Sequence, residues 1–378
     1  MTVQSALAIV SHPFTTTSEG KKETNWKLEP VTLPAPGPNE IVVEMIATGI
    51  CHTDIALSLY PIPGETTPKS AVLGHEGSGY IRALGEGVTS HNIGDKVLLS
   101  FKYCKACEQC EEGHPAFCEN FLPNLQGTDG YFTSSSGEAI KGQIFGQSSF
   151  ASFSVVAESS AVNVTQLLND EELKLCAPLG CGIQTGSGAI INIAKAGPKD
   201  RVVIMGLGGV GMSAIMAAKY MGCKTIIGID RLQSRIDLAL ELGATHGINT
   251  SKMDAEKEVM EITSKKGATI VADTTGFEPL FDAAMRFLSR RGKMIIIGMC
   301  FGNYKFHADR LMTSGQRIIG CVEGDSIPSE YIPRMIQMYR EGHLPFDRLV
   351  KEYPAADFQK ALHAMEDGSV IKPILTWK

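Results

Sequence analysis

The stretch RVVIMGLGGVGMSAIMAAKYMG, residues 201–222, decides the fold of this chain. A short apolar run typical of a buried strand leads into GLGGVG, and a run with helical spacing follows. In such a turn the first glycine permits a tight bend, the second lets the backbone approach a pyrophosphate, and the third allows close helix packing. This context predicts a dinucleotide-binding unit with Gly206, Gly208, Gly209 and Gly211 at the cofactor phosphates. A fold of the same kind that binds no dinucleotide is the alternative.

The same pattern of strand and helix continues beyond this stretch. Apolar runs at 224–230, 268–276 and 292–299 alternate with helical segments such as 233–244. Short strands separated by helices predict parallel βαβ units, so we expect an α/β fold with a doubly wound Rossmann sheet from about residue 185. The first half differs, since short β-rich runs separated by turns occupy 40–50, 77–85 and 95–101. After about residue 325 the alternation weakens, and the tail could return to pack on the first half.

An acidic residue follows the glycine-rich turn at the distance that cofactor binding requires. Asp230 lies nineteen residues past Gly211, at the end of the next apolar strand. A carboxylate there accepts hydrogen bonds from the ribose hydroxyls and repels a 2′-phosphate, which favours NAD over NADP. Arg231 and Arg235 follow Asp230 closely in the sequence. They weaken the preference for NAD, because an arginine can bind the 2′-phosphate of NADP.

Composition excludes several classes of partner. The chain has 378 residues, a net charge of −6 and no long block of like charge, so neither nucleic acid nor an anionic membrane is expected as a partner. The start of the chain lacks the pattern of a signal peptide, and no run of about 18 apolar residues indicates a membrane span. We therefore expect a cytoplasmic protein whose thiols stay reduced.

Four cysteines crowd into CKACEQCEEGHPAFC, residues 104–118. Their spacing is C-x2-C-x2-C-x7-C, whereas a bacterial ferredoxin run places its fourth cysteine after three residues and before a proline. Four thiolates that bracket a polar turn can wrap a tetrahedral ion with no open position, as structural zinc sites do. We predict structural zinc at Cys104, Cys107, Cys110 and Cys118, with an iron–sulfur cluster or free thiols as the alternatives.

Taken in order, several motifs resemble the zinc-dependent medium-chain alcohol dehydrogenases. They are GICHTD (49–54), GHEGSG (74–79), the four-cysteine lobe, PLGCGIQTG (178–186) and GLGGVG with its downstream acid, and they cover essentially the entire chain. The resemblance implies a GroES-like, β-rich catalytic domain at 1–184 and 325–378, and a Rossmann NAD-binding domain inserted at 185–324.

The same resemblance implies a catalytic zinc. Cys51, His75 and Cys181 become its ligands, which leaves a fourth position for water or substrate and brings the expected total to two zinc ions per chain. Glu76 is expected to approach the metal during ligand exchange, and Asp54 to orient the imidazole of His75. The alternative for Glu76 and Asp54 is an ordinary structural or surface carboxylate.

The implied reaction is hydride transfer from a zinc-bound alkoxide to the nicotinamide, and its reverse. Thr53 matches the hydroxyl that takes the alcohol proton, and His52 matches a position that meets the cofactor pyrophosphate. Relatives often complete the proton relay with a histidine where this chain has Ala56, so either His52 or water must replace it. By the same matching, Thr185, Val210, Met299 and Lys372 are expected at the cofactor, although Lys372 could also be an exposed surface lysine. The remaining cysteines, which lack metal-like spacing, are expected in the core: Cys176, Cys223, Cys300 and Cys321.

For the substrate, the stretches 145–151, 178–186 and 322–350 most resemble the benzyl alcohol or aryl-alcohol branch. Phe101, Tyr103 and Phe145, with Met299, could form an apolar slot for a flat ring, or simply be core aromatics. We expect oxidation of primary aromatic or allylic alcohols by a homodimer or homotetramer. The alternatives are a broad aliphatic or glutathione-dependent formaldehyde dehydrogenase, an aldehyde reductase of secondary metabolism, and a noncatalytic nucleotide-binding descendant.

Overall fold

The computed structural model describes residues 4–60, 69–300 and 303–377, and the chain forms two compact units. Unit 1 comprises Met1–Cys181, Ile327–Ile336 and Leu349–Lys378, and unit 2 comprises Gly182–Ser326 and Gln337–Arg348. From the sequence we expect all of 325–378 in one domain, whereas Gln337–Arg348 belongs to unit 2. There Arg348 forms an ion pair with Glu241, at 2.6 Å between Nη2 and Oε2. The domain limits 1–184, 185–324 and 325–378 stay predictions.

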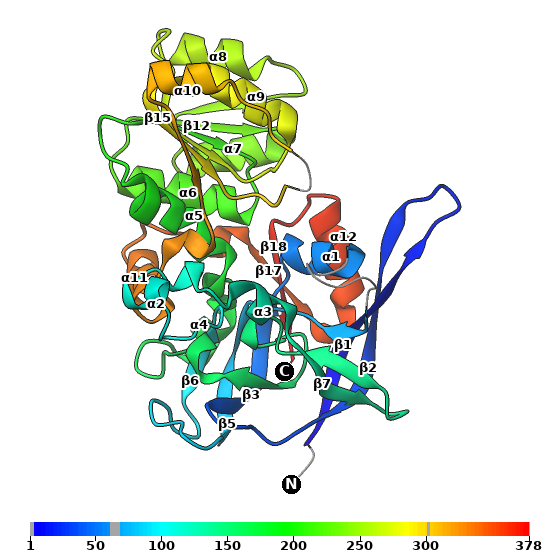
Figure 1. Cartoon of the computed structure of the whole chain (residues 1–378). Helices are drawn as coiled ribbons and strands as arrows, with labels where there is room; N and C mark the ends of the chain where they lie inside the picture. The colour runs from blue at the N-terminus through cyan, green and yellow to red at the C-terminus, as the bar shows by residue number, and fades with distance from the viewer. Residues whose placement is uncertain (1–3, 61–68, 301–302, 378) are drawn as a thin grey trace. The chain divides into compact units, whose positions relative to one another are not determined.

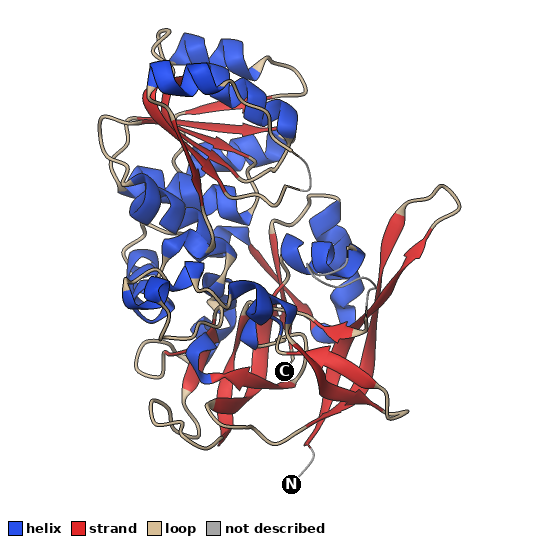
Figure 2. Cartoon of the chain, in the orientation of Figure 1, coloured by secondary structure: helices blue, strands red, loops and turns tan. Residues whose placement is uncertain are grey.

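Unit 2 is built on a six-stranded parallel sheet with the strand order β13-β12-β11-β14-β15-β16. Numbered from β11, this is the order 3-2-1-4-5-6 of the doubly wound dinucleotide-binding fold. Helices cover both faces of this sheet (Figure 2). The strands are β11 Arg201–Met205, β12 Thr225–Asp230, β13 His246–Asn249, β14 Ala268–Asp273, β15 Leu288–Ile296 and β16 Arg317–Gly320. The helices are α5 Gly182–Gly188, α6 Gly209–Tyr220, α7 Gln233–Leu242, α8 Ala255–Ile262, α9 Glu278–Phe287 and α10 Ala308–Ser314.

The glycine-rich turn connects β11 to α6 as predicted, and Figure 1 labels α6 beside α5. Gly206 has a φ of +84°, a left-handed conformation that L side chains rarely adopt. A Cβ on Gly211 would lie 1.8 Å from the carbonyl oxygen of Gly206, so only glycine allows the helix to start this close to the strand. Gly208 caps α6, and a Cβ there would meet nothing within 4 Å.

Unit 1 contains two β-structures. One is a closed barrel of strands in the order β1-β2-β7-β8-β4, and the other is a sheet in the order β10-β6-β5-β3-β18-β17, with β9 also paired to β3. The strands are β1 Gln4–Thr16, β2 Lys22–Leu33, β3 Glu40–Gly49, β4 Ala71–Val72, β5 Gly77–Leu84, β6 Lys96–Leu99, β7 Thr128–Ser134, β8 Ala139–Gly142, β9 Phe153–Ala157, β10 Ala161–Asn163, β17 Val350–Pro354 and β18 Lys372–Thr376. The helices are α1 His52–Leu59, α2 Glu108–Glu111, α3 Phe121–Gln126, α4 Asp170–Leu175 and α12 Phe358–Glu366, and α11 Pro328–Arg340 is divided between the units.

The C-terminal tail returns to the first half of the chain, which confirms the expectation from sequence. β18 runs antiparallel to β3, and Ile374 lies opposite Gly49. Ile374 and Leu375 are fully buried, so the tail completes the core of unit 1. Among the described residues, no helix combines the length and apolar character needed to cross a membrane.

Candidate functional site

Four predicted metal-site residues converge inside unit 1. Cys51, His75, Glu76 and Cys181 each place a ligand atom so that these atoms all lie within 4.8 Å of one another. Cys51 caps the start of α1, His75 and Glu76 lie in the turn before β5, and Cys181 follows the short 3-10 helix η4, Ala177–Gly180. Residues far apart in the sequence thus form one cluster of thiols, imidazole and carboxylate, in which all but the partly buried Cys51 are buried.

Asp54 links three parts of this cluster. Its Oδ2 accepts a hydrogen bond from the backbone N–H of Cys51 at 3.0 Å. Its Oδ1 accepts from the backbone N–H of Gly74 and from Nδ1 of His75, both at 3.0 Å. Because Nδ1 donates to a carboxylate, the lone pair of the neutral imidazole lies on Nε2. Asp54 is fully buried, as a residue that orients a ligand should be.

His75 Nε2 is a buried nitrogen without a hydrogen-bond partner among the described residues. A buried polar atom in this state costs free energy unless a ligand or ion satisfies it. Burial lowers the pKa of His75, but Asp54 and Cys51 outweigh it and raise the pKa well above its usual value. The same negative field favours a cation at Nε2, so two thiols and this imidazole fit a metal ion with an open fourth position.

The thiol of Cys51 is suited to act as a thiolate. A hydrogen bond from Cys181 lowers the pKa of Cys51 well below its usual value, and the charges of Lys372 and His75 add to this effect against burial. Thiolates rather than thiols bind metal.

Glu76 forms a buried ion pair with Lys372, a residue that the family resemblance places at the cofactor. Nζ of Lys372 donates to both carboxylate oxygens of Glu76, at 2.8 and 3.0 Å, and to the carbonyl oxygen of Ile50 at 3.2 Å. Lys372 is 4% exposed, so the alternative of an exposed surface lysine is wrong. In this structure the three N–H donors of the ammonium group are thus directed to Glu76 and Ile50, and a place for Lys372 at the cofactor stays a prediction.

The four-cysteine lobe forms a second cluster in unit 1. The sulfurs of Cys104, Cys107, Cys110 and Cys118 all lie within 4.8 Å of one another. Sγ of Cys104 lies 3.9 Å from that of Cys110, and Sγ of Cys107 lies 4.0 Å from that of Cys118. Four sulfurs bound at about 2.3 Å in a tetrahedron would lie about 3.8 Å apart. The lobe therefore fits one closed tetrahedral ion.

In unit 2, Asp230 ends β12 next to the glycine-rich turn. Its Oδ2 accepts from the backbone N–H of Leu207 at 2.8 Å, and Oδ1 accepts from those of Arg231 and Leu232 at 2.7 and 3.0 Å. Nη1 of Arg235 lies 3.9 Å from Oδ2. A carboxylate has about four acceptor positions, so one remains for a ribose hydroxyl.

The remaining predicted residues occupy varied surroundings. His52 is exposed at the first position of α1, and Thr53 and Ala56 are partly buried. In unit 2, Oγ1 of Thr185 lies 3.5 Å from Oε2 of Glu323, the carbonyl of Val210 accepts from Ser213, and Met299 is 47% exposed.

Three of the expected core thiols are buried, namely Cys176, Cys223 and Cys321, whereas Cys300 is partly exposed. The expectation was wrong for Cys300 because it follows the buried part of β15.

Of the side chains predicted to form an aromatic slot, Phe101 packs in the core of unit 1, and Phe145 packs against the metal cluster. Phe101 and Phe145 are buried, and Phe101 lies 6.0 Å from Tyr103 between ring centroids. The ring of Phe145 stacks on His75 at 4.7 Å. Phe145 adopts a φ of +55°, an uncommon conformation for an aromatic residue. A strained backbone here indicates that the surroundings fix this ring in place.

Sequence reasoning missed Gln147. Its Nε2 donates to the carbonyl oxygens of His75 and Ser100, both at 2.9 Å, and its Oε1 accepts from the backbone N–H of Gly77 at 3.2 Å. Gln147 is fully buried and fixes the turn that carries His75. The signal was present in FGQSSFA, where a glutamine stands among aromatic and small residues.

Known proteins match this fold and site. Residues 37–166 match the alcohol dehydrogenase GroES-like domain, and residues 209–341 match the zinc-binding dehydrogenase family. The chain is 37% identical to a geraniol dehydrogenase from Castellaniella defragrans, over 93% of this chain and 94% of that protein. The crystal structure of benzyl alcohol dehydrogenase from Acinetobacter calcoaceticus is 36% identical, covers 99% of both chains and has a TM-score of 0.88. An alcohol dehydrogenase zinc-binding domain protein from Burkholderia ambifaria is 37% identical over 99% of both chains, with a TM-score of 0.89.

The fold and the site define an oxidoreductase that acts on the CH–OH group of an alcohol. The chain belongs to the zinc-dependent medium-chain alcohol dehydrogenases, with a GroES-like domain and a Rossmann domain. As a member of this family it uses zinc and a nicotinamide cofactor on small-molecule alcohols.

Proposed function

We propose that this enzyme oxidises primary aromatic or allylic alcohols to aldehydes with NAD, and catalyses the reverse reduction. Two similarities support the substrate class, since geraniol is an allylic alcohol and benzyl alcohol an aromatic one. The observation that carries the proposal is the cluster around His75, whose Nε2 faces two thiols while Phe145 stacks on the imidazole ring. A flat, apolar substrate suits an aromatic wall beside a metal site.

The proposed roles follow from the contacts. Cys51, His75 and Cys181 hold the catalytic zinc, and the four cysteines of the lobe hold a structural zinc. When bound, zinc supplies a Lewis acid and NAD supplies a hydride acceptor. Asp54 keeps the imidazole oriented, and Glu76 stays beside the site, paired with Lys372 until ligand exchange.

Proton movement is assigned to α1. Oγ1 of Thr53 receives the alcohol proton, and His52, exposed at the start of the same helix, passes it to water. Ala56 cannot take part, because its methyl group carries no exchangeable proton. In unit 2, Asp230 accepts a ribose hydroxyl and disfavours a 2′-phosphate, while Thr185, Val210 and Met299 line the cofactor site.

We further propose the domain limits 1–184 with 325–378 and 185–324, and a homodimer or homotetramer. We also assign the enzyme to the reducing cytoplasm, because six of its ten cysteines are zinc ligands in this proposal and such thiols must stay reduced.

The test is nicotinamide reduction by the zinc-replete enzyme across benzyl alcohol, cinnamyl alcohol, geraniol, short aliphatic alcohols and S-hydroxymethylglutathione, with NAD and NADP in parallel. We expect the highest kcat/KM for the benzylic and allylic alcohols with NAD. A preference for aliphatic alcohols, or activity that depends on glutathione, would refute the substrate class. Phe145→Ala should lower kcat/KM for benzyl alcohol more than for ethanol, because it removes the aromatic wall.

A further inference from the structure

We propose that a basic cavity in unit 2, at the edge of the parallel sheet opposite the glycine-rich turn, binds a small phosphate-bearing anion. Arg201 is the first residue of β11, Leu288 is the first of β15, and Gly267 directly precedes β14. The cavity therefore lies at the amino ends of the strands, whereas the glycine-rich turn follows the carboxyl end of β11. Four residue steps along β11 separate the two by about 13 Å. This site is distinct from the cofactor site and goes beyond the proposed function.

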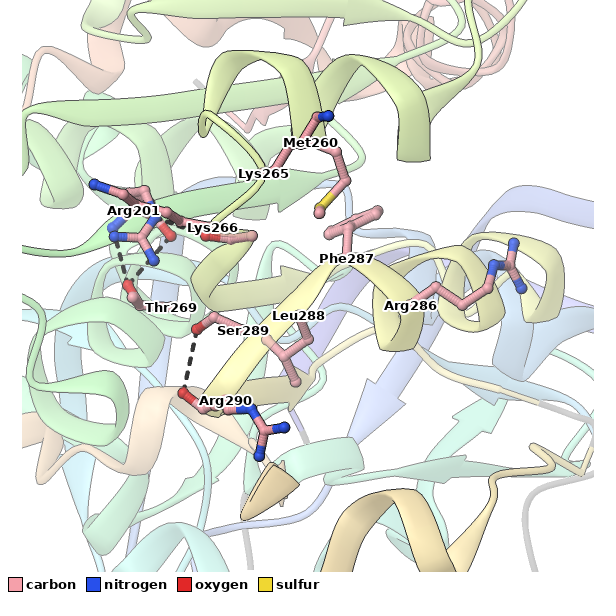
Figure 3. Close-up of a pocket in the computed structure, with 11 residues that line it drawn as sticks. Arg201, Met260, Lys265, Lys266, Thr269, Arg286, Phe287, Leu288, Ser289 and Arg290 are labelled. Atoms are coloured by element: carbon pink, nitrogen blue, oxygen red, sulfur yellow. Dashed lines mark hydrogen bonds between the residues drawn. The ribbon is translucent and has the colours of Figure 1, made fainter. Parts of the chain in front are cut away.

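The cavity is large enough for a metabolite and is strongly cationic. Its volume is about 550 Å³, which lies within the usual range of small-molecule sites. Five side chains that line it are basic, and none of the described residues that line it is acidic. Figure 3 shows these side chains around the cavity, on several elements and pointing in different directions: Arg201, Lys265, Lys266, Arg286 and Arg290.

Four of these five charges have no carboxylate partner within 4.0 Å among the described residues. Nε of Arg201 donates to the carbonyl oxygen of Gly267 at 2.6 Å, and Nη1 of Arg290 donates to that of Thr313 at 3.1 Å. Carbonyl groups hold the guanidinium groups in place without cancelling their charge. Only Arg286 is neutralised, by Glu256 at 2.6 Å. In a protein of net charge −6, this is a local concentration of uncompensated positive charge.

The two lysines are presented by the short loop between α8 and β14. Ser264 and Lys265 take left-handed φ values of 49° and 63°. The backbone N–H of Lys265 donates to the carbonyl oxygen of Met260 at 2.6 Å, and the backbone N–H of Lys266 donates to the carbonyl oxygen of Thr263 at 3.0 Å. The loop amides are thus already used within the loop, so an anion must be bound by the exposed ammonium and guanidinium groups.

The chemistry of the lining favours phosphate on a small molecule. Guanidinium groups bind phosphate oxygens through paired N–H donors, and ammonium groups bind them as point charges. Met260 is partly exposed in the same cavity, above the buried side chains of Phe287 and Leu288, and an organic phosphate ester could contact this apolar surface. A nucleic acid would require an extended basic stripe, whereas the basic residues here line one small cavity.

The experiment is isothermal titration of the full-length, zinc-replete enzyme with fructose 1,6-bisphosphate at constant ionic strength. Saturating NAD fills the cofactor phosphate site beforehand, and zinc content is measured afterwards. We expect about one bisphosphate per chain. The double variant Lys265→Ala/Lys266→Ala should bind about tenfold more weakly, since each charge-assisted bond contributes substantially. Arg290→Met, on a different element, should weaken binding as well.

The matched control is Lys224→Ala/Lys257→Ala, which removes two exposed lysines of unit 2 that do not line the cavity. This control should bind as the wild type does. The proposal is overturned if the NAD-saturated wild type takes up no bisphosphate, or if the control loses affinity as much as the cavity variant. Neither result would alter the alcohol panel, so the proposed function stands or falls separately.

Discussion

Lys372 and Glu76 form a buried ion pair inside unit 1, although 296 residues separate them in the sequence. Burial raises the pKa of Glu76 against the opposing charge of Lys372. For Lys372, burial lowers the pKa, but Glu76 and Cys51 outweigh it and the net shift is upward. The pair gives the metal cluster a positive charge that offsets part of its thiolate and carboxylate charge. It also holds the Glu76 carboxylate by both of its oxygens.

Breaking this pair on one side should be costly. Lys372→Met leaves the Glu76 carboxylate buried without its cation, and such a change typically destabilises a protein by about 3–5 kcal/mol. Lys372→Met/Glu76→Gln should recover a large part of that loss, because no unpaired charge remains. Denaturant unfolding of the wild type, both single variants and the double variant measures the coupling. Additive effects of the two substitutions would contradict the pairing.

Asp54→Asn should weaken the metal site while leaving the fold of unit 1 intact. The amide can still accept one of the backbone hydrogen bonds, but it no longer presents a charged acceptor to Nδ1 of His75. Loss of such a partner lowers metal affinity about 10- to 100-fold. Competition with a chromogenic chelator measures this affinity, and circular dichroism checks the fold. Wild-type zinc retention by the folded variant would show that Asp54 does not orient the ligand.

Asp230→Asn should shift the choice of cofactor. The variant removes the negative charge that repels a 2′-phosphate yet keeps an oxygen for the backbone N–H of Leu207. We expect the ratio of kcat/KM with NAD to that with NADP to fall about tenfold. Asp237→Asn is the matched control, because Asp237 is exposed on α7 and bonded to Gln233. An unchanged ratio in the Asp230 variant would remove this residue from cofactor selection.

The fold of unit 2 could be predicted because each of its signals is local. The apolar run of β11, the three glycines and the helical spacing of α6 are contiguous, and their physical requirements leave few alternatives. The barrel of unit 1 could not be predicted in the same way. β7, TDGYFTS, is mostly exposed or half-buried, and β4 contains only Ala71 and Val72, so neither shows a clear alternation. Their pairing depends on partners distant in the sequence.

The site shows the same division. The four-cysteine lobe was recognised by its spacing, whereas Cys51, His75 and Cys181 were expected as ligands because the motifs, in their order along the chain, resemble the family. The pairing of Lys372 with Glu76 could not be predicted. A lysine in a strand carries no signal that its acceptor lies near the opposite end of the chain. Gln147 was missed for a similar reason, since its three hydrogen bonds go to backbone groups, which every residue offers.

Substitution in the four-cysteine lobe should lower the zinc content and the thermal stability of the enzyme without lowering kcat. Cys104→Ser should remove one of the two zinc ions expected per chain, because its sulfur lies 3.9 Å from that of Cys110 within the cluster. Metal binding of this kind stabilises the fold directly, so we expect the midpoint of thermal inactivation to fall by about 10 °C. Cys223→Ser is the control, since this buried thiol donates to the carbonyl oxygen of Gly197, lies in neither cluster found among the described residues, and should leave both zinc ions bound. The zinc content of the purified variants is measured by plasma emission spectrometry. Their kcat is measured at a temperature at which the Cys104 and the Cys223 variants both remain folded. A Cys104 variant that keeps both zinc ions would exclude the lobe as a metal site, whereas loss of one ion with kcat preserved would establish that this ion is structural.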